Sequence, residues 1–220
     1  AASIYAGNGA NTIEANVAYV RLGNGGNVVS GSVGNILAGT GNDIINLTND
    51  GAIVNLNAGD NEFTYEGSSA TITSGSGSDT INARNGSNYV IISSNSGADV
   101  FVGYTSSDSI KTNSVDFNIL GNDDSEDVTV TADNGSIVLV GARDTGVTLV
   151  DSAGTLHKAE YSTEFKAFMD GGEIHGTDGY TGSARIDFIK NDGSGDIIVD
   201  GGSDIVYNTG NGAHIYMGEG

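Results

Sequence analysis

The sequence predicts an all-β fold, a parallel β-roll or β-helix solenoid interrupted by a β-hairpin insert and a short helix. Gly, Asn, Asp and Ser separate short apolar cores, and the 220 residues include 35 Gly and no Pro. Two such units make a coil of 16 to 19 residues with one strand on each side. Stacked coils bury each thin core against its neighbours. The cores recur every seven to ten residues, centred at Ile13, Val20, Val28, Ile36, Ile44, Ile53, Phe63, Ile72, Ile81, Val90 and Val100.

Residues 1–103 form the first solenoid block. Glycine suits its turns because glycine tolerates positive φ and close backbone approach. The turns lie 16 to 20 residues apart, so we expect them to stack on one edge. They read GNGAN (7–11), GNGGN (23–27), GTGND (39–43), AGDNE (58–62), GSGSD (75–79) and NSGAD (95–99).

The rest of the chain predicts three further segments. Residues 104–155 alternate as longer strands and form a β-strand insert, in which Asp-Asn-Gly at 133–135 predicts a hairpin turn. Residues 156–180 predict a short helix and a loop, because Ser162 or Thr163 can cap a helix over 162–170. Residues 181–220 return to the repeat as a second solenoid block.

Several turns resemble the haemolysin-type nonapeptide repeats of the RTX family of secreted proteins, G-G-x-G-x-D-x-U-x. The best matches are GTGNDIIN (39–46), GSGSDTIN (75–82), GSGDIIVD (193–200) and GGSDIVYN (201–208), and the resemblance covers about 140 residues. It implies that Ca²⁺ binds between adjacent coils at a subset of turns and that folding occurs outside the cell. The implied ligands form two clusters, Asp43, Asp60, Asp79 and Asp99 in the first block and Asp187, Asp192, Asp196, Asp200 and Asp204 in the second.

A second interpretation of the turns needs no metal. Asn11, Asn27, Asn35 and Asn88 stand where the family carries Asp, and an amide offers calcium only a neutral oxygen. Stacked Asn side chains can instead form an amide ladder, in which each bonds to the next coil. Both interpretations stay open at this point.

The charge of the chain limits its partners. With 28 acids against 8 bases, the net charge is −20, which disfavours nucleic acid and anionic membrane surfaces. No apolar stretch approaches the ~20 residues of a membrane span.

The chain has no Cys and three widely separated His, so no zinc site is predicted. Bases are sparse beside the acids, and we therefore predict that the chain is not an enzyme.

These observations together favour a secreted structural protein of the extracellular space or cell surface. We expect a calcium-stabilised component of a surface layer, adhesin or filament. Open solenoid ends, which expose strand edges, predict head-to-tail self-association. The alternative is a module that binds a polysaccharide or another cell-surface partner, for which tyrosines aligned on one face would be the signature.

Overall fold

The computed structural model describes residues 2–83, 86–87, 89–92, 96–122, 125–132, 135–162, 167–169, 180–181, 188–191, 194–201 and 204–219. The chain divides into two compact units, Ala1–Lys158 (unit 1) and Ala159–Gly220 (unit 2). Each unit is described by itself.

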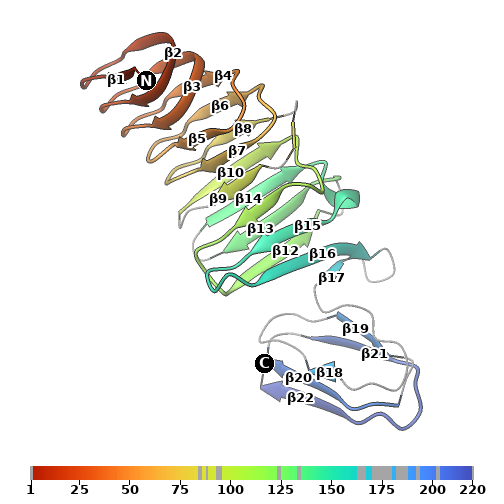
Figure 1. Ribbon diagram of the computed structural model, residues 1–220. Coiled ribbons are helices and arrows are strands. Elements are labelled where there is room, and N and C mark those ends of the chain that lie inside the picture. The colour runs from red at the N-terminus through yellow and green to blue at the C-terminus, as the bar shows by residue number, and fades with distance from the viewer. Residues whose placement is uncertain are drawn as a thin grey trace. The chain divides into compact units, whose positions relative to one another are not determined.

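Unit 1 is a parallel β-solenoid whose coils contribute strands to two files (Figure 1). The long strands β2 (Thr12–Arg21) and β3 (Val28–Leu37) pass through both files, their first halves in file 1 and their second halves in file 2. File 1 continues through β4 (Ile44–Leu47), β6 (Glu62–Tyr65), β8 (Thr80–Asn82), β10 (Gly97–Val102) and β14 (Gly135–Val140). File 2 begins with β1 (Ser3–Tyr5) and continues after β3 through β5 (Ala52–Asn55), β7 (Ala70–Thr73), β9 (Val90–Ile92), β11 (Ser109–Lys111) and β15 (Val147–Val150).

The core of unit 1 follows from this parallel register. Ile45 pairs with Phe63, Phe63 with Ile81, and Ile81 with Phe101. All four side chains are fully buried, so each inward residue lies over its counterpart in the next coil. Ile44 is 42% exposed, because alternate residues of a strand face opposite sides of the sheet. The predicted solenoid is therefore confirmed.

The segment 104–155 leaves the stack for one hairpin and then rejoins it. β12 (Phe117–Gly121) pairs antiparallel with β13 (Val128–Ala132), and β13 pairs antiparallel with β14. The pairing of Ala132 with Gly135 leaves a two-residue connection, which confirms the predicted hairpin. β14 and β15 then stack in parallel on β10 and β11, with a short 3₁₀ turn, η1 (Arg143–Thr145), between them.

The short helix predicted over 162–170 is wrong where the structure describes it. Ser162 ends β16 (Leu156–Ser162), and β17 (Ala167–Met169) is a strand. The two pair antiparallel, with Tyr161 opposite Phe168. A helix this short is marginal in isolation, and a neighbouring strand offers its backbone groups regular partners. Residues 163–166 and 170 lie outside the described residues.

Unit 2 returns to parallel coils, as the sequence predicts. β20 (Ile197–Gly201) lies between β18 (Tyr180–Thr181) and β22 (Ile215–Glu219), and β19 (Phe188–Asn191) pairs with β21 (Ile205–Asn208). Among its described residues, Ile189, Ile197 and Val199 form a buried core cluster, against which Val206 packs. Across the described parts of both units, no helix has the length and apolarity needed to cross a membrane.

Candidate functional site

A ladder of Asn and Asp side chains runs along one edge of unit 1, where each coil turns into its file 1 strand. From the second member onward, the Oδ1 of each member accepts a hydrogen bond of 2.8 to 3.2 Å from the backbone N–H of the member one coil earlier. Each buried backbone N–H thereby gains a partner that it would otherwise lack. The members of this inner ladder lie 16 to 20 residues apart and are Asn11, Asn27, Asp43, Asn61, Asp79 and Asp99.

Local sequence explains why these side chains point inward. Each member stands two residues before an inward apolar residue of file 1, as Asp43 does before Ile45 and Asn61 before Phe63. Residues i and i+2 of an extended chain face the same side. From the second member onward, each residue of the ladder is at most 3% exposed. The ladder is therefore part of the core rather than of the surface.

The asparagines use their amide protons as well as their oxygens. Asn27 Nδ2 donates to Gly25 O of its own turn at 2.6 Å and to Asp43 Oδ1 in the next coil at 2.8 Å. Asn61 makes the equivalent bond to Asp79 Oδ1 at 2.8 Å. Each amide thus closes its own turn and joins two coils. Together with the bond from Asn11 Nδ2 to Asn27 Oδ1 at 2.8 Å, these bonds confirm the amide-ladder interpretation for Asn11 and Asn27.

The aspartates of the inner ladder lack those protons when they are ionised. Within the described structure, Asp43 Oδ2 and Asp79 Oδ2 are buried and have no hydrogen-bond partner. Burial raises the pKa of Asp79 to about 7 against the lowering effect of the Asn61 hydrogen bonds, and the charge of Asp99 raises it further. Burial also raises the pKa of Asp99. A protonated Asp79 carries a hydroxyl that can donate a hydrogen bond. The asparagines of the ladder donate such bonds with their amide groups.

Asp60 belongs to a different row. We predicted that Asp43, Asp60, Asp79 and Asp99 would fall on successive turns of one edge, and the structure brings all of them except Asp60 into the inner ladder. Asp60 is exposed one residue before the ladder position. Its N–H donates to Asn42 Oδ1 at 2.9 Å, and its Oδ1 accepts from Ser78 N–H at 2.8 Å. Asn42, Asp60 and Ser78 thus form an outer ladder, in which the backbone N–H groups of Asp60 and Ser78 each donate to a side chain of the preceding coil. In the inner ladder the backbone N–H groups of all members but the last donate to side chains of the following coil.

Asn61 is the ladder member that sequence reasoning missed. In the turn AGDNE the aspartate is Asp60, whereas the inward position, two residues before Phe63, belongs to Asn61. Asn35, which the sequence predicts to be a turn residue, lies instead within β3 and pairs with Tyr19 and Ile53. Asn88 lies outside the described residues.

Calcium binding at these turns stays a prediction. Among the residues that the structure describes, no group of three or more His, Cys, Asp or Glu is placed to hold a metal ion. The Oδ1 atoms of Asp43, Asp79 and Asp99 accept bonds from the preceding coil. The inner ladder therefore joins successive coils by hydrogen bonds of the chain itself.

The second predicted cluster is described only in part. Asp187, Asp192 and the side chain of Asp200 lie outside the described residues. Asp196 is exposed, and its Oδ1 lies 2.9 Å from His214 Nδ1 in the next coil of unit 2. Asp204 is half-buried just before β21. Asp196 thus differs from the buried aspartates of unit 1, because it precedes the buried Ile197 by one residue rather than two.

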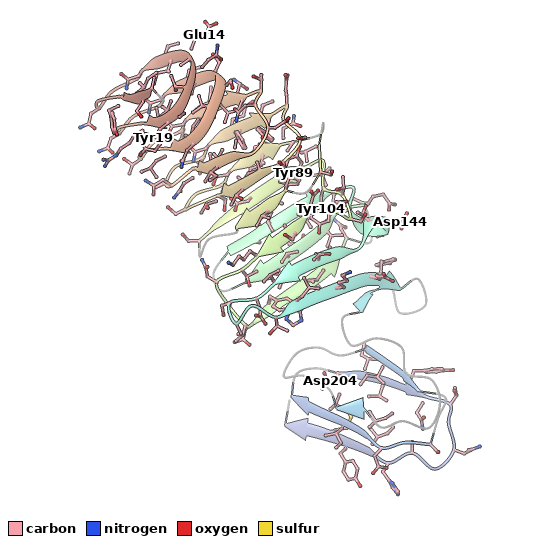
Figure 2. All side chains as sticks on the ribbon, viewed as in Figure 1. Glu14, Tyr19, Tyr89, Tyr104, Asp144 and Asp204 are labelled. Carbon is pink, nitrogen blue, oxygen red and sulfur yellow. The ribbon has the colours of Figure 1, made fainter. Side chains whose placement is uncertain are left out.

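Tyrosine hydroxyls form hydrogen bonds at the edge of unit 1 opposite the inner ladder, where Tyr89 and Tyr104 lie (Figure 2). Tyr65 Oη donates to the Asn49 or Ser69 carbonyl, each at 2.6 Å, and Tyr89 Oη donates to Gly67 O at 2.9 Å. Burial raises the pKa of Tyr89 and Tyr104 to about 12. Because Tyr65, Tyr89 and Tyr104 lie in the core, they form no exposed tyrosine stripe.

Comparisons of this chain with protein-family models, with curated proteins and with solved structures found no match.

Proposed function

We propose that the chain is a rigid structural element of a secreted or cell-surface protein, such as a surface layer, adhesin or filament. The observation that carries this proposal is the inner ladder, which joins successive coils of unit 1 by side chains at most 3% exposed from Asn27 to Asp99. Such a repeat transmits load from coil to coil, because each coil contacts its neighbours.

The net charge supports a location outside the cell. A chain of 220 residues with a net charge of −20 repels itself in a dilute medium, and salt or divalent ions relieve that repulsion. The absence of Cys leaves the fold independent of redox state, which suits either side of a membrane. Secretion and calcium stabilisation belong to the proposal on the strength of the charge and of the resemblance to RTX repeats.

The test is the location and assembly of the native protein. Antibodies raised against the chain are applied to intact cells, to washed envelopes and to culture supernatant, each prepared with millimolar calcium and with chelator. Electron microscopy of the positive fraction then shows whether the protein forms a layer or filaments. Recovery only from the cytosol, as dispersed particles, would contradict the proposal.

A further inference from the structure

A shallow polar groove of about 390 Å³ lies on unit 1 where file 2 turns toward the inner ladder. One wall is an outward row of side chains in register, Tyr5, Arg21 and Leu37. The other wall is the turn row Asn8, Asn24 and Thr40. Successive coils are about 4.8 Å apart, so the groove presents polar groups at that interval over about 10 Å.

Glycines keep the floor of the groove open. A Cβ atom on Gly23 would meet the carbonyl of Gly7, and one on Gly39 would overlap the carbonyl of Gly23. No side chain therefore fits between the two walls at Gly23 or at Gly39. In the next coil Asn57 takes the corresponding place, and its Nδ2 reaches back to Ala38 O at 3.2 Å, which closes that end of the groove.

Asn57 is also the one non-glycine residue with positive φ, +65°, in the described part of the chain. Asn adopts this left-handed conformation more readily than other side chains. Residues held in sparsely populated backbone regions gather at ligand-binding sites. The end of the groove is therefore shaped by a side chain whose backbone is held in an uncommon conformation.

The chemistry of the groove differs from that of the rest of the chain. Among the described residues that line it, none is Asp or Glu, and Arg21 supplies a guanidinium, although the chain carries 28 acids and 8 bases. Arg21 is exposed, and no carboxylate of the described residues lies within ion-pair distance of it. Tyr5 is 70% exposed, and its ring lies 5.8 Å from that of Tyr19; Tyr19 lies on the first coils of unit 1 (Figure 2).

An extended peptide is a poor occupant of the groove. Peptides bind to sheets mainly by pairing with free backbone groups at an edge. Here the turn backbone is already paired between coils, with Gly9 N–H donating to Asn24 O at 2.7 Å and Gly25 N–H to Thr40 O at 2.8 Å. What remains for a ligand is side-chain amides, a hydroxyl, a guanidinium and one aromatic face.

We propose that this groove binds a short stretch of an acidic polysaccharide, two or three uronic acid residues long. The Tyr5 ring packs against one sugar face, the Asn8, Asn24 and Thr40 side chains bond hydroxyls at intervals of one coil, and Arg21 forms paired hydrogen bonds to a carboxylate. This inference goes beyond the structural role proposed above and does not depend on it.

The test is calorimetric titration of the full chain with trisaccharides of galacturonate, mannuronate and guluronate, each compared with its methyl ester. The ester keeps the sugar and removes the charge. Chelator is present throughout, so that calcium bridges between ligand and protein carboxylates cannot contribute. We expect at least one uronate to bind at least about tenfold more tightly than its ester, with an affinity that falls as salt rises.

Variants then locate the binding. Tyr5→Ala is expected to weaken uronate binding about tenfold or more, because Tyr5 is the one aromatic residue among the described lining of the groove. Arg21→Gln is expected to reduce the uronate to the affinity of its ester. Lys111→Gln, an outward base in the β11 strand of the same file, and Tyr207→Ala, an exposed tyrosine of unit 2, are the matched controls and leave binding unchanged.

Three results would each overturn the proposal. The first is the absence of saturable binding by all three uronates, and the second is equal affinity for acid and ester. The third is unchanged binding by Tyr5→Ala or Arg21→Gln when circular dichroism shows both variants folded.

Discussion

Replacing Asp79 by Asn is expected to stabilise unit 1, and to do so more at pH 8 than at pH 5. In the folded chain the pKa of Asp79 is about 7, against an ordinary value of 3.8. The folded state therefore holds a proton that the unfolded chain releases. The stabilisation from this proton is fully present below pH 3.8 and is lost as the pH rises through about 7.

The size of the effect follows from the pKa difference. One unit corresponds to about 1.4 kcal/mol, so full deprotonation of Asp79 lowers the free energy of unfolding by roughly 4 kcal/mol. Between pH 5 and pH 8 the loss is roughly 2.5 kcal/mol. An asparagine does not titrate, and its amide can donate to Asp99 Oδ1 as Asn61 Nδ2 donates to Asp79 Oδ1. The gain from Asp79→Asn should therefore be larger at pH 8 by about 2.5 kcal/mol.

Urea unfolding followed by circular dichroism at pH 5, 6.5 and 8 measures this difference. Asp60→Asn is the matched control, because it makes the same chemical change at an exposed position of the outer ladder, and the charge of Asp60 makes the smallest contribution to the raised pKa of Asp79. Its effect should stay within about 0.5 kcal/mol at every pH. An Asp79→Asn variant with equal effects at pH 5 and pH 8, or one less stable than the parent at pH 8, would refute the reasoning.

Three further predictions follow from the packing of unit 1. Gly39→Ala should lower the free energy of unfolding by about 1–3 kcal/mol in thermal melts, because the new Cβ would overlap the Gly23 carbonyl. Gly7→Ala is the control and should melt like the parent, because no atom lies within 4 Å of its new Cβ. Tyr89→Phe, which removes the hydroxyl that donates to Gly67 O, should cost about 1 kcal/mol, and an equal cost for the exposed Tyr5→Phe would contradict a role for the buried bond. Calcium titration should release or absorb heat and raise the Tm, as the resemblance implies, and the absence of both effects would contradict calcium binding. In chelator unit 1 should keep its β signal in circular dichroism, because the inner ladder joins its coils by hydrogen bonds. Loss of all β signal in chelator would contradict that role of the ladder.

The sequence predicted the stacking of coils because the physical cause of stacking is local. Short apolar segments at coil spacing can be buried only by lying over one another, as Ile45, Phe63 and Ile81 do. The turn residues were harder to place, because the coils lengthen from 16 to 20 residues. When the turns are aligned on their aspartates, Asp60 falls in the row of Asp43 and Asp79. The residue that points inward in that coil is Asn61.

Long-range pairing accounts for the remaining differences between sequence and structure. The strand at Ala167–Met169 depends on its partner Glu160–Ser162, which a local pattern of apolar residues does not reveal. The burial of Tyr65 and Tyr89 depends on carbonyls 16 and 22 residues earlier in the chain. Composition alone could not separate these core tyrosines from the exposed Tyr5.

Hydrogen exchange by NMR at the turn amides tests the central claim most directly, that buried side chains bond successive coils at their corners. The backbone amides of Asn27, Asp43, Asn61 and Asp79 lie outside the regular strands and donate to side chains of the next coil. We predict that they exchange as slowly as the strand amides of Ile45 and Phe63. Exchange at the rate of solvent-exposed turn amides, while the strands stay protected, would contradict the account.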